Sequence, residues 1–254
     1  GNDRSIPADI IYAFEQDREG RLWVGTYSAG VFLWDTEEGT VAHYPHDPKD
    51  PTSLSDNLVY DIHKQQNGSV WVATNRGVNR LDPGAEGWDR YLHDTNDRST
   101  ISSDTTRAIH ESSDGTIWIG TTGGGLNKYI PETDSFVSYT RADGLASNTV
   151  TGILEDEKGR LWLATTNGVS VLDPVLGHFR NLDEEDGLGG LDFSGASMRD
   201  SDGSLWFGGA HGVTVLEGPI REPNRHRPRM HITGVSVLGE PRRPEGVTFD
   251  GSTV

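Results

Sequence analysis

The chain has 254 residues, a formal net charge of −17 and no cysteine. This length suits one large domain or two small ones. The acidic balance disfavours nucleic acid and anionic lipid and favours neutral or cationic partners. The absence of cysteine excludes disulfides, thiol nucleophiles and thiolate metal sites. No apolar run is long enough to span a membrane, so we expect any membrane attachment to lie in segments outside this sequence.

One pattern recurs five times along the chain. Its centre is a tryptophan that returns every 44 to 48 residues, at Trp23, Trp71, Trp118, Trp162 and Trp206. Apolar residues flank each tryptophan, a glycine stands three residues before it, and glycine or alanine stands two residues after it. A short run that is apolar throughout predicts a strand covered on both faces. A repeat of this period is typical of propeller blades.

Each repeat predicts the same succession of strands. An Asp or Asn fourteen residues before the tryptophan is expected to start a strand through an Asx-type turn, at Asp9, Asn57, Asp104, Asn148 and Asp192. The strand that follows has small residues near its middle, with Asp61 as the exception, and is expected to lie innermost. The tryptophan strand is second, a third follows the next glycine, and the first four repeats add a fourth. The sequence therefore predicts an all-β propeller of five blades with three to four antiparallel strands each.

The fifth repeat lacks a fourth strand and runs into a segment rich in proline and arginine. We therefore predict three parts: propeller repeats over 1–218, a linker over 219–229, and the first strands of a β-sandwich domain over 230–254. A hairpin turn is expected at Leu238, Gly239 and Glu240. Because the last blade is short, we also expect the five blades to be a fragment of a larger propeller.

The repeat resembles that of the two-component regulator propeller family. The residues that carry the resemblance span about 1–217 and include DREGRLWVGTYSAGVFLWD, QQNGSVWVATNRGVNRLD, SSDGTIWIGTTGGGLNKY, DEKGRLWLATTNGVSVLD, SDGSLWFGGAHGVTVLE and the junction DGLASNTV at 143–150. In that family, periplasmic propellers precede an immunoglobulin-like β-sandwich, a membrane helix and an intracellular histidine kinase or diguanylate cyclase. Polysaccharide breakdown products are inputs for some members. The segment after Arg229 is similar to the opening strand of that β-sandwich.

The resemblance implies a periplasmic, ligand-sensing domain of a membrane-anchored bacterial receptor. Its expected partner is a small polar ligand such as an oligosaccharide, and the full-length receptor is expected to form a homodimer. The resemblance implies no enzymatic activity in this region and carries over no catalytic residue.

Two alternatives remain open on the sequence: a propeller lyase or glycosidase acting on a carbohydrate or lactone, and a protein-interaction scaffold. The Asp-box of sialidase-type propellers is absent, and the acidic run 183–186 predicts a solvated loop rather than a glycosidase pair. His63 and His110 occupy equivalent positions and could meet on adjacent blades. However, no histidine spacing indicates a metal site, and no cofactor is predicted.

Candidate ligand-binding residues are those that vary at two fixed places in the repeat. The place eleven residues before the tryptophan holds Tyr12, Tyr60 and Arg107, followed by Thr151 and Gly195; the loop between the second and third strands holds Tyr27, Arg76, Asn167 and His211. Aromatic rings with a few polar groups around a concavity suit a small polar ligand. The five repeated tryptophans are predicted to be packing residues, and Trp34 and Trp88 to occupy solvated edge positions.

Overall fold

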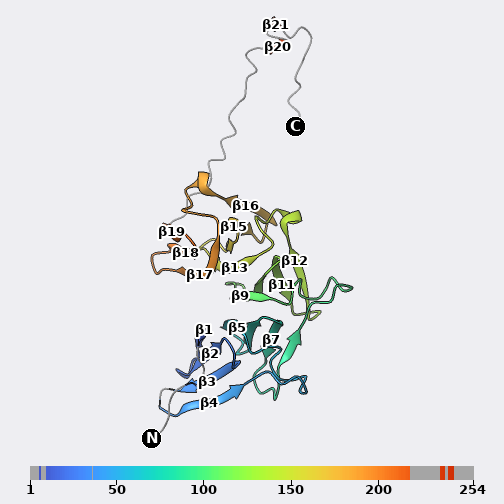
Figure 1. Cartoon of the computed structure of the whole chain (residues 1–254), viewed down its shortest axis with the longest axis vertical. Coiled ribbons are helices and arrows are strands. Elements are labelled where there is room, and N and C mark those ends of the chain that lie inside the picture. Colours follow the sequence, from blue (N-terminus) through green and yellow to red (C-terminus); the bar gives the residue numbers. More distant parts are fainter. Residues whose placement is uncertain (1–5, 7–9, 36, 218–234, 238–239, 243–254) are drawn as a thin grey trace. The chain divides into compact units, whose positions relative to one another are not determined.

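The computed structural model describes residues 6, 10–35, 37–217, 235–237 and 240–242. The chain divides into two compact units, Gly1–Pro219 and Ile220–Val254. The first unit is an all-β propeller of five antiparallel blades, as the sequence predicts (Figure 1). Its innermost strands follow one another in chain order, β1 beside β5, then β9, β13 and β17.

Within the described residues, four blades have four strands and the fifth has three, and the strands of each blade are hydrogen-bonded in chain order. The strands of blades 1 and 2 are β1 (Ile11–Gln16), β2 (Leu22–Thr26), β3 (Val31–Asp35), β4 (Gly39–Tyr44), β5 (Val59–Lys64), β6 (Val70–Thr74), β7 (Gly77–Leu81) and β8 (Asp89–Tyr91). Those of blades 3 to 5 are β9 (Thr106–Glu111), β10 (Ile117–Thr121), β11 (Leu126–Ile130), β12 (Ser135–Tyr139), β13 (Val150–Glu155), β14 (Leu161–Thr165), β15 (Gly168–Asp173), β16 (His178–Leu182), β17 (Phe193–Arg199), β18 (Leu205–Gly209) and β19 (Gly212–Leu216).

The core consists of repeated layers between successive blades. The tryptophan of one blade packs against apolar residues of the next blade's first and second strands. Trp23 shares a cluster with Val59 and Ile62, and Trp118 shares one with Val150 and Ile153. The tryptophan strands do not alternate apolar and polar residues, because both faces of such a strand contact other blades.

The glycine two positions after the tryptophan in blades 1 and 3 is explained by the same packing. A Cβ built on Gly120 would lie 2.7 Å from the carbonyl oxygen of Val150 in the next blade. On Gly25 it would lie 3.1 Å from Cβ of Val59. The sequence prediction of close backbone approach at these positions is confirmed.

The DGL sequences before blades 4 and 5 form matching 3₁₀ turns, Arg141–Asp143 and Glu184–Asp186. In the first, the side chain of Asp143 accepts the backbone N–H of Thr140 at 2.8 Å, and Gly144 adopts a φ of 109° that favours glycine. Leu145 is then buried between blades 3 and 4. In the second turn, Asp183 and Asp186 complete a capping box, so part of the acidic run has a local structural role.

Asn57, Asp104 and Asn148, which precede the innermost strands of blades 2 to 4, do not make the local turn that the sequence predicts, and Asp9 lies outside the described residues. Instead, the side-chain oxygen of Asn57 accepts the N–H of His46, eleven residues earlier, at 2.7 Å, and its carbonyl accepts the N–H of Gly30 at 3.0 Å. Asn148 bonds Arg141 and Gly125 in the same way. These residues therefore close the long connecting loop and tie it to the preceding blade.

Two tryptophans differ from their predicted environments. Trp88 is only 4% exposed, because it packs edge-on against Trp23 of blade 1 with ring centroids 6.5 Å apart, so the predicted solvated edge is wrong for it. Trp206 is 36% exposed, whereas the other four repeated tryptophans are buried. No described residue covers its face in the way that blade 2 covers Trp23. Correspondingly, Phe14 of blade 1 stands where Ile62 stands in blade 2 and is 73% exposed.

The second unit has two described strands, β20 (Val235–Val237) and β21 (Glu240–Arg242), which pair antiparallel. The predicted linker and the turn residues Leu238 and Gly239 lie outside the described residues. The β-sandwich domain stays a prediction.

Candidate functional site

The innermost strands of all five blades line one cavity of about 530 Å³ on the propeller axis. In Figure 1, the labels β1, β5, β9, β13 and β17 mark the strands around this axis. The cavity wall contains the residue eleven positions before the tryptophan in every blade, namely Tyr12, Tyr60, Arg107, Thr151 and Gly195. Residues at one position of the repeat therefore surround the same cavity, because every blade places its innermost strand against the propeller axis.

Tyr12, Tyr60 and Arg107 of this ring form a continuous surface with Tyr27, which lies in the loop after β2 and contacts Tyr12. The rings of Tyr12 and Tyr27 have centroids 6.0 Å apart, and Tyr12 lies equally close to Tyr60. The guanidinium carbon of Arg107 lies over the Tyr60 ring, 4.1 Å from its centroid. Tyr12 and Tyr27 are about half exposed. Because large aromatic rings are usually buried, exposed rings beside a cavity offer a stacking surface to a ligand.

On blades 4 and 5, the equivalent residues Thr151 and Gly195 contact each other's blade. The hydroxyl of Thr151 donates to the carbonyl of Phe193 at 2.9 Å and is buried, so it is not available to a ligand. Gly195 has a φ of 96°, and an added Cβ would lie 2.6 Å from the carbonyl of Thr151. These two residues join blades 4 and 5, so the aromatic rings and the arginine of the cavity wall lie on blades 1 to 3.

Asp61 is a polar group of this cavity that the sequence marked only as an exception to the small-residue pattern. Its carboxylate accepts the N–H of Ile109 at 2.7 Å and that of Ile62 at 2.9 Å. Burial raises the pKa of Asp61 to about 7, a shift that the two backbone N–H groups oppose and that the charge of Glu15 adds to. Asp61 thus bonds blade 2 to blade 3 in the cavity wall.

We expect the Asp61→Asn variant to gain stability relative to the native protein as the pH rises from 5 to 8. The folded-state pKa lies above the unfolded value of 3.8, so Asp61 stabilises the fold fully below that value and loses this contribution as the pH rises through 7. Because Asp61 is partly exposed to the cavity, we expect a relative change of about 2 kcal/mol. Urea unfolding of both proteins at the two pH values measures it.

The matched control is Asp97→Asn, since hydrogen bonds from Ser99 lower the pKa of Asp97 and it stays ionised over this range. A stability difference between the native protein and Asp61→Asn that is the same at pH 5 and pH 8 would contradict the assignment.

Three predicted site residues lie away from this surface. Arg76 is exposed and lines a separate cavity of about 130 Å³ with His46 and Arg90. Asn167 is exposed, and its side-chain amide donates to the carbonyl of Ala146 at 3.4 Å. His211 lines a small pocket in blade 5. The structure therefore brings together Tyr12, Tyr27, Tyr60 and Arg107 but not these three.

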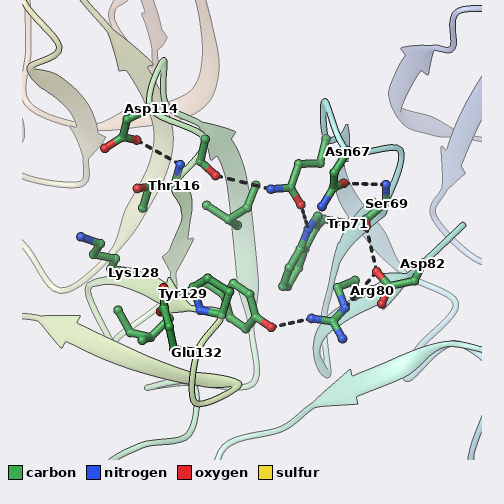
Figure 2. A pocket seen from close by; sticks show the side chains of 15 residues that line it. Asn67, Ser69, Trp71, Arg80, Asp82, Asp114, Thr116, Lys128, Tyr129 and Glu132 are labelled. Carbon is green, nitrogen blue, oxygen red and sulfur yellow. Dashed lines mark hydrogen bonds and ion pairs between the residues drawn. The ribbon is translucent and has the colours of Figure 1, made fainter.

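A second cavity, of about 500 Å³, lies between blades 2 and 3 near the turns that join their first and second strands. Figure 2 shows Trp71 and Arg80 of blade 2 on one side and Tyr129 of blade 3 on the other. The indole N–H of Trp71 donates to Gln65, and Arg80 donates to the Tyr129 hydroxyl. The Arg80 bond to Tyr129 and a bond from the side-chain amide of Gln65 to the carbonyl of Gly115 join the two blades across this cavity.

The equivalent histidines do not converge as a metal site would require. His63 faces Glu111 at 3.3 Å and His110 faces Glu155 at 3.5 Å, each across a blade boundary. Burial lowers the pKa of His110, which favours its neutral form. Among the described residues, no group of three or more His, Cys, Asp or Glu side chains is placed to hold a metal ion.

Three segments of the chain match the repeat of the two component regulator propeller family, residues 5–28, 100–123 and 144–167. Each ends shortly after a repeated tryptophan and includes the innermost and second strands of its blade. Blades 1, 3 and 4 therefore match the repeat of this family over their innermost and second strands. No curated protein sequence matches it.

Several solved propellers share this fold. The extracellular domain of the hybrid two component system BT4673 from B. thetaiotaomicron aligns with a TM-score of 0.71 and 21% identity, over 83% of this chain and 30% of that one. The extracellular domain of BT3049 from the same organism gives 0.57 and 22%, over 84% and 34%. Virginiamycin B lyase from Staphylococcus aureus gives 0.60 and 16%, over 84% and 71%. This chain thus spans about a third of the length of the extracellular domains.

Among the described residues, no helix is long and apolar enough to cross a bilayer.

Proposed function

We propose that this propeller is the ligand-sensing part of a membrane-anchored bacterial receptor and lies on the periplasmic side of the inner membrane. The observation that carries the proposal is the exposed surface of Tyr12, Tyr27 and Tyr60 with Arg107 at a cavity on the propeller axis. The family repeats, and the shared fold with extracellular domains of hybrid two component systems, support a sensing role.

The ligand is a small polar molecule of the size of a mono- or disaccharide. A volume of about 530 Å³ falls within the usual range for small-molecule sites. Tyrosine rings with an apolar face and a polar tip suit the mixed surface of a sugar. Ligand binding would shift the receptor between two arrangements, provided that the ligand binds one arrangement more tightly.

Thermal unfolding of the chain against a panel of oligosaccharides and small metabolites tests the proposal. A ligand at about a hundred times its dissociation constant adds roughly 2.7 kcal/mol, so we expect a rise in Tm of several degrees. The rise should be reduced in Tyr12→Ala, whose side chain is 52% exposed, and retained in Val137→Ala on the outer strand β12. A panel without any shift, or a shift that Tyr12→Ala leaves unchanged, would overturn the proposal.

The same mixtures distinguish a sensor from an enzyme. The propeller fold is shared with a lyase, and Asp61 is a carboxyl group with a raised pKa in the cavity. Breakdown of a sugar or lactone that is lost in Asp61→Asn would identify a propeller enzyme. We expect binding without turnover, in line with the family repeats and the fold shared with extracellular domains of hybrid two component systems.

A further inference from the structure

We propose that Arg107 binds an anionic group of the ligand at the axial cavity, so that the preferred ligand is an acidic sugar. This inference rests on the proposed function, since it names the ligand class of the same site. It differs from the expectation raised by the net charge of −17, which favours neutral or cationic partners.

The first observation is that Arg107 has no carboxylate partner among the described residues. Other arginines of the propeller do: Arg21 pairs with Asp17 at 2.8 Å, and Arg160 pairs with Asp156 at 2.7 Å. The described contact of Arg107 is the ring of Tyr60. Arg76 and Arg90, which line the separate cavity of about 130 Å³, also have no carboxylate of the described residues within ion-pair distance, so the feature particular to Arg107 is that it lies unpaired in the wall of the axial cavity.

The second observation is that Asp61, the acidic residue that lines the same cavity, does not pair with Arg107. Asp61 follows Tyr60 in β5, but its two oxygens accept the N–H groups of Ile62 and Ile109. Its raised pKa also reduces its negative charge near neutral pH. Asp61 therefore does not neutralise the guanidinium group in place of a ligand.

The third observation is the stacking geometry. A guanidinium over an aromatic ring uses its flat face, and the N–H groups at its edge stay available for a bidentate bond to a carboxylate, sulfate or phosphate. Stacking also holds the side chain in place before the ligand arrives, which lowers the conformational entropy lost on binding. Tyr12 lies beside Tyr60 and would contact the sugar ring while Arg107 binds its anionic group.

Four sugars with one common ring test the proposal: glucose, glucuronate, glucose 6-sulfate and glucose 6-phosphate. Their affinities are measured by titration calorimetry on the native chain at one ionic strength. We expect at least one charged sugar to bind ten- to a hundredfold more tightly than glucose, as charge-assisted hydrogen bonds would give. The three charged sugars identify which anionic group the site accepts.

Variants of Arg107 show whether this residue causes the preference for a charged sugar over glucose. Arg107→Met should reduce the preferred charged sugar to the affinity of glucose. Arg107→Lys should retain part of the preference, because it keeps the charge but not the bidentate edge. Arg141→Met removes the same charge from an exposed position and should leave the preference unchanged.

The inference is overturned if no charged sugar binds more tightly than glucose, or if the preference survives Arg107→Met. Its failure is distinct from failure of the proposed function. A neutral oligosaccharide that raises Tm in the native chain but not in Tyr12→Ala would leave a sensor without an anion subsite.

Discussion

Replacing Trp71 by alanine is expected to lower the free energy of unfolding by about 3–5 kcal/mol, as for other buried large aromatic residues. The Trp71 side chain is fully buried, its ring stacks near Tyr91 at 5.7 Å and contacts Tyr129 at 4.9 Å, and its N–H donates to Gln65. The substitution leaves a cavity between blades 2 and 3 and removes the partner of Gln65. Thermal unfolding followed by far-UV circular dichroism measures the loss.

The matched control is Trp206→Ala, at the same position of the fifth repeat. Trp206 is 36% exposed, so its removal creates little cavity, and we expect a loss of about 1 kcal/mol. An equal loss of free energy of unfolding in Trp71→Ala and Trp206→Ala would show that the tryptophan stabilises mainly its own blade. In that case packing between blades would not be its main contribution.

Replacing Gly125 by alanine is expected to cost about 3 kcal/mol or more. Gly125 directly precedes β11, the third strand of blade 3, and has a φ of 86°, a region that costs an alanine about 1–2 kcal/mol. In addition, the new Cβ would overlap the carbonyl oxygen of Tyr139, the last residue of β12. That oxygen belongs to backbone paired with β11, so it can move only at the expense of the sheet.

Two further glycines separate these effects. Gly123 lies in the same loop with a φ of 83° and has open space at its Cβ position, so Gly123→Ala should show only the backbone cost. Gly212 is the equivalent of Gly125 in blade 5, where the described residues include no fourth strand beside it, and its Cβ position is also open. In urea unfolding, Gly125→Ala should therefore have a clearly lower free energy of unfolding than the other two variants. Similar losses in all three would contradict the clash.

Part of the candidate site could be predicted from the sequence because it depends on register. Tyr12, Tyr60 and Arg107 share one position of the repeat, and identical blades around one axis bring identical positions together. Loop residues follow no such rule. Arg76 and His211 share a loop with Tyr27 in the repeat, yet only Tyr27 reaches the axial surface, because loop length and side-chain direction differ between blades.

The roles of Asn57, Trp88 and Asp61 could not be predicted from local sequence. Asn57 bonds a residue eleven positions away, and Trp88 packs against a tryptophan of the preceding blade. Asp61 bonds the backbone of the following blade and has its pKa raised by burial there. In each case the partner is distant in sequence, so a pattern within one repeat carries no information about it.

The sequence alone determined the five blades, the strand order within each and the three described strands of the last, since these follow from periodicity, turn glycines and strand length. Only the tertiary structure decided which tryptophan is exposed, which carboxyl group lies in the cavity wall, and that the arginine of that wall has no acidic partner among the described residues. These properties depend on what a neighbouring blade places opposite each side chain, and burial and charge pairing arise between blades rather than within them.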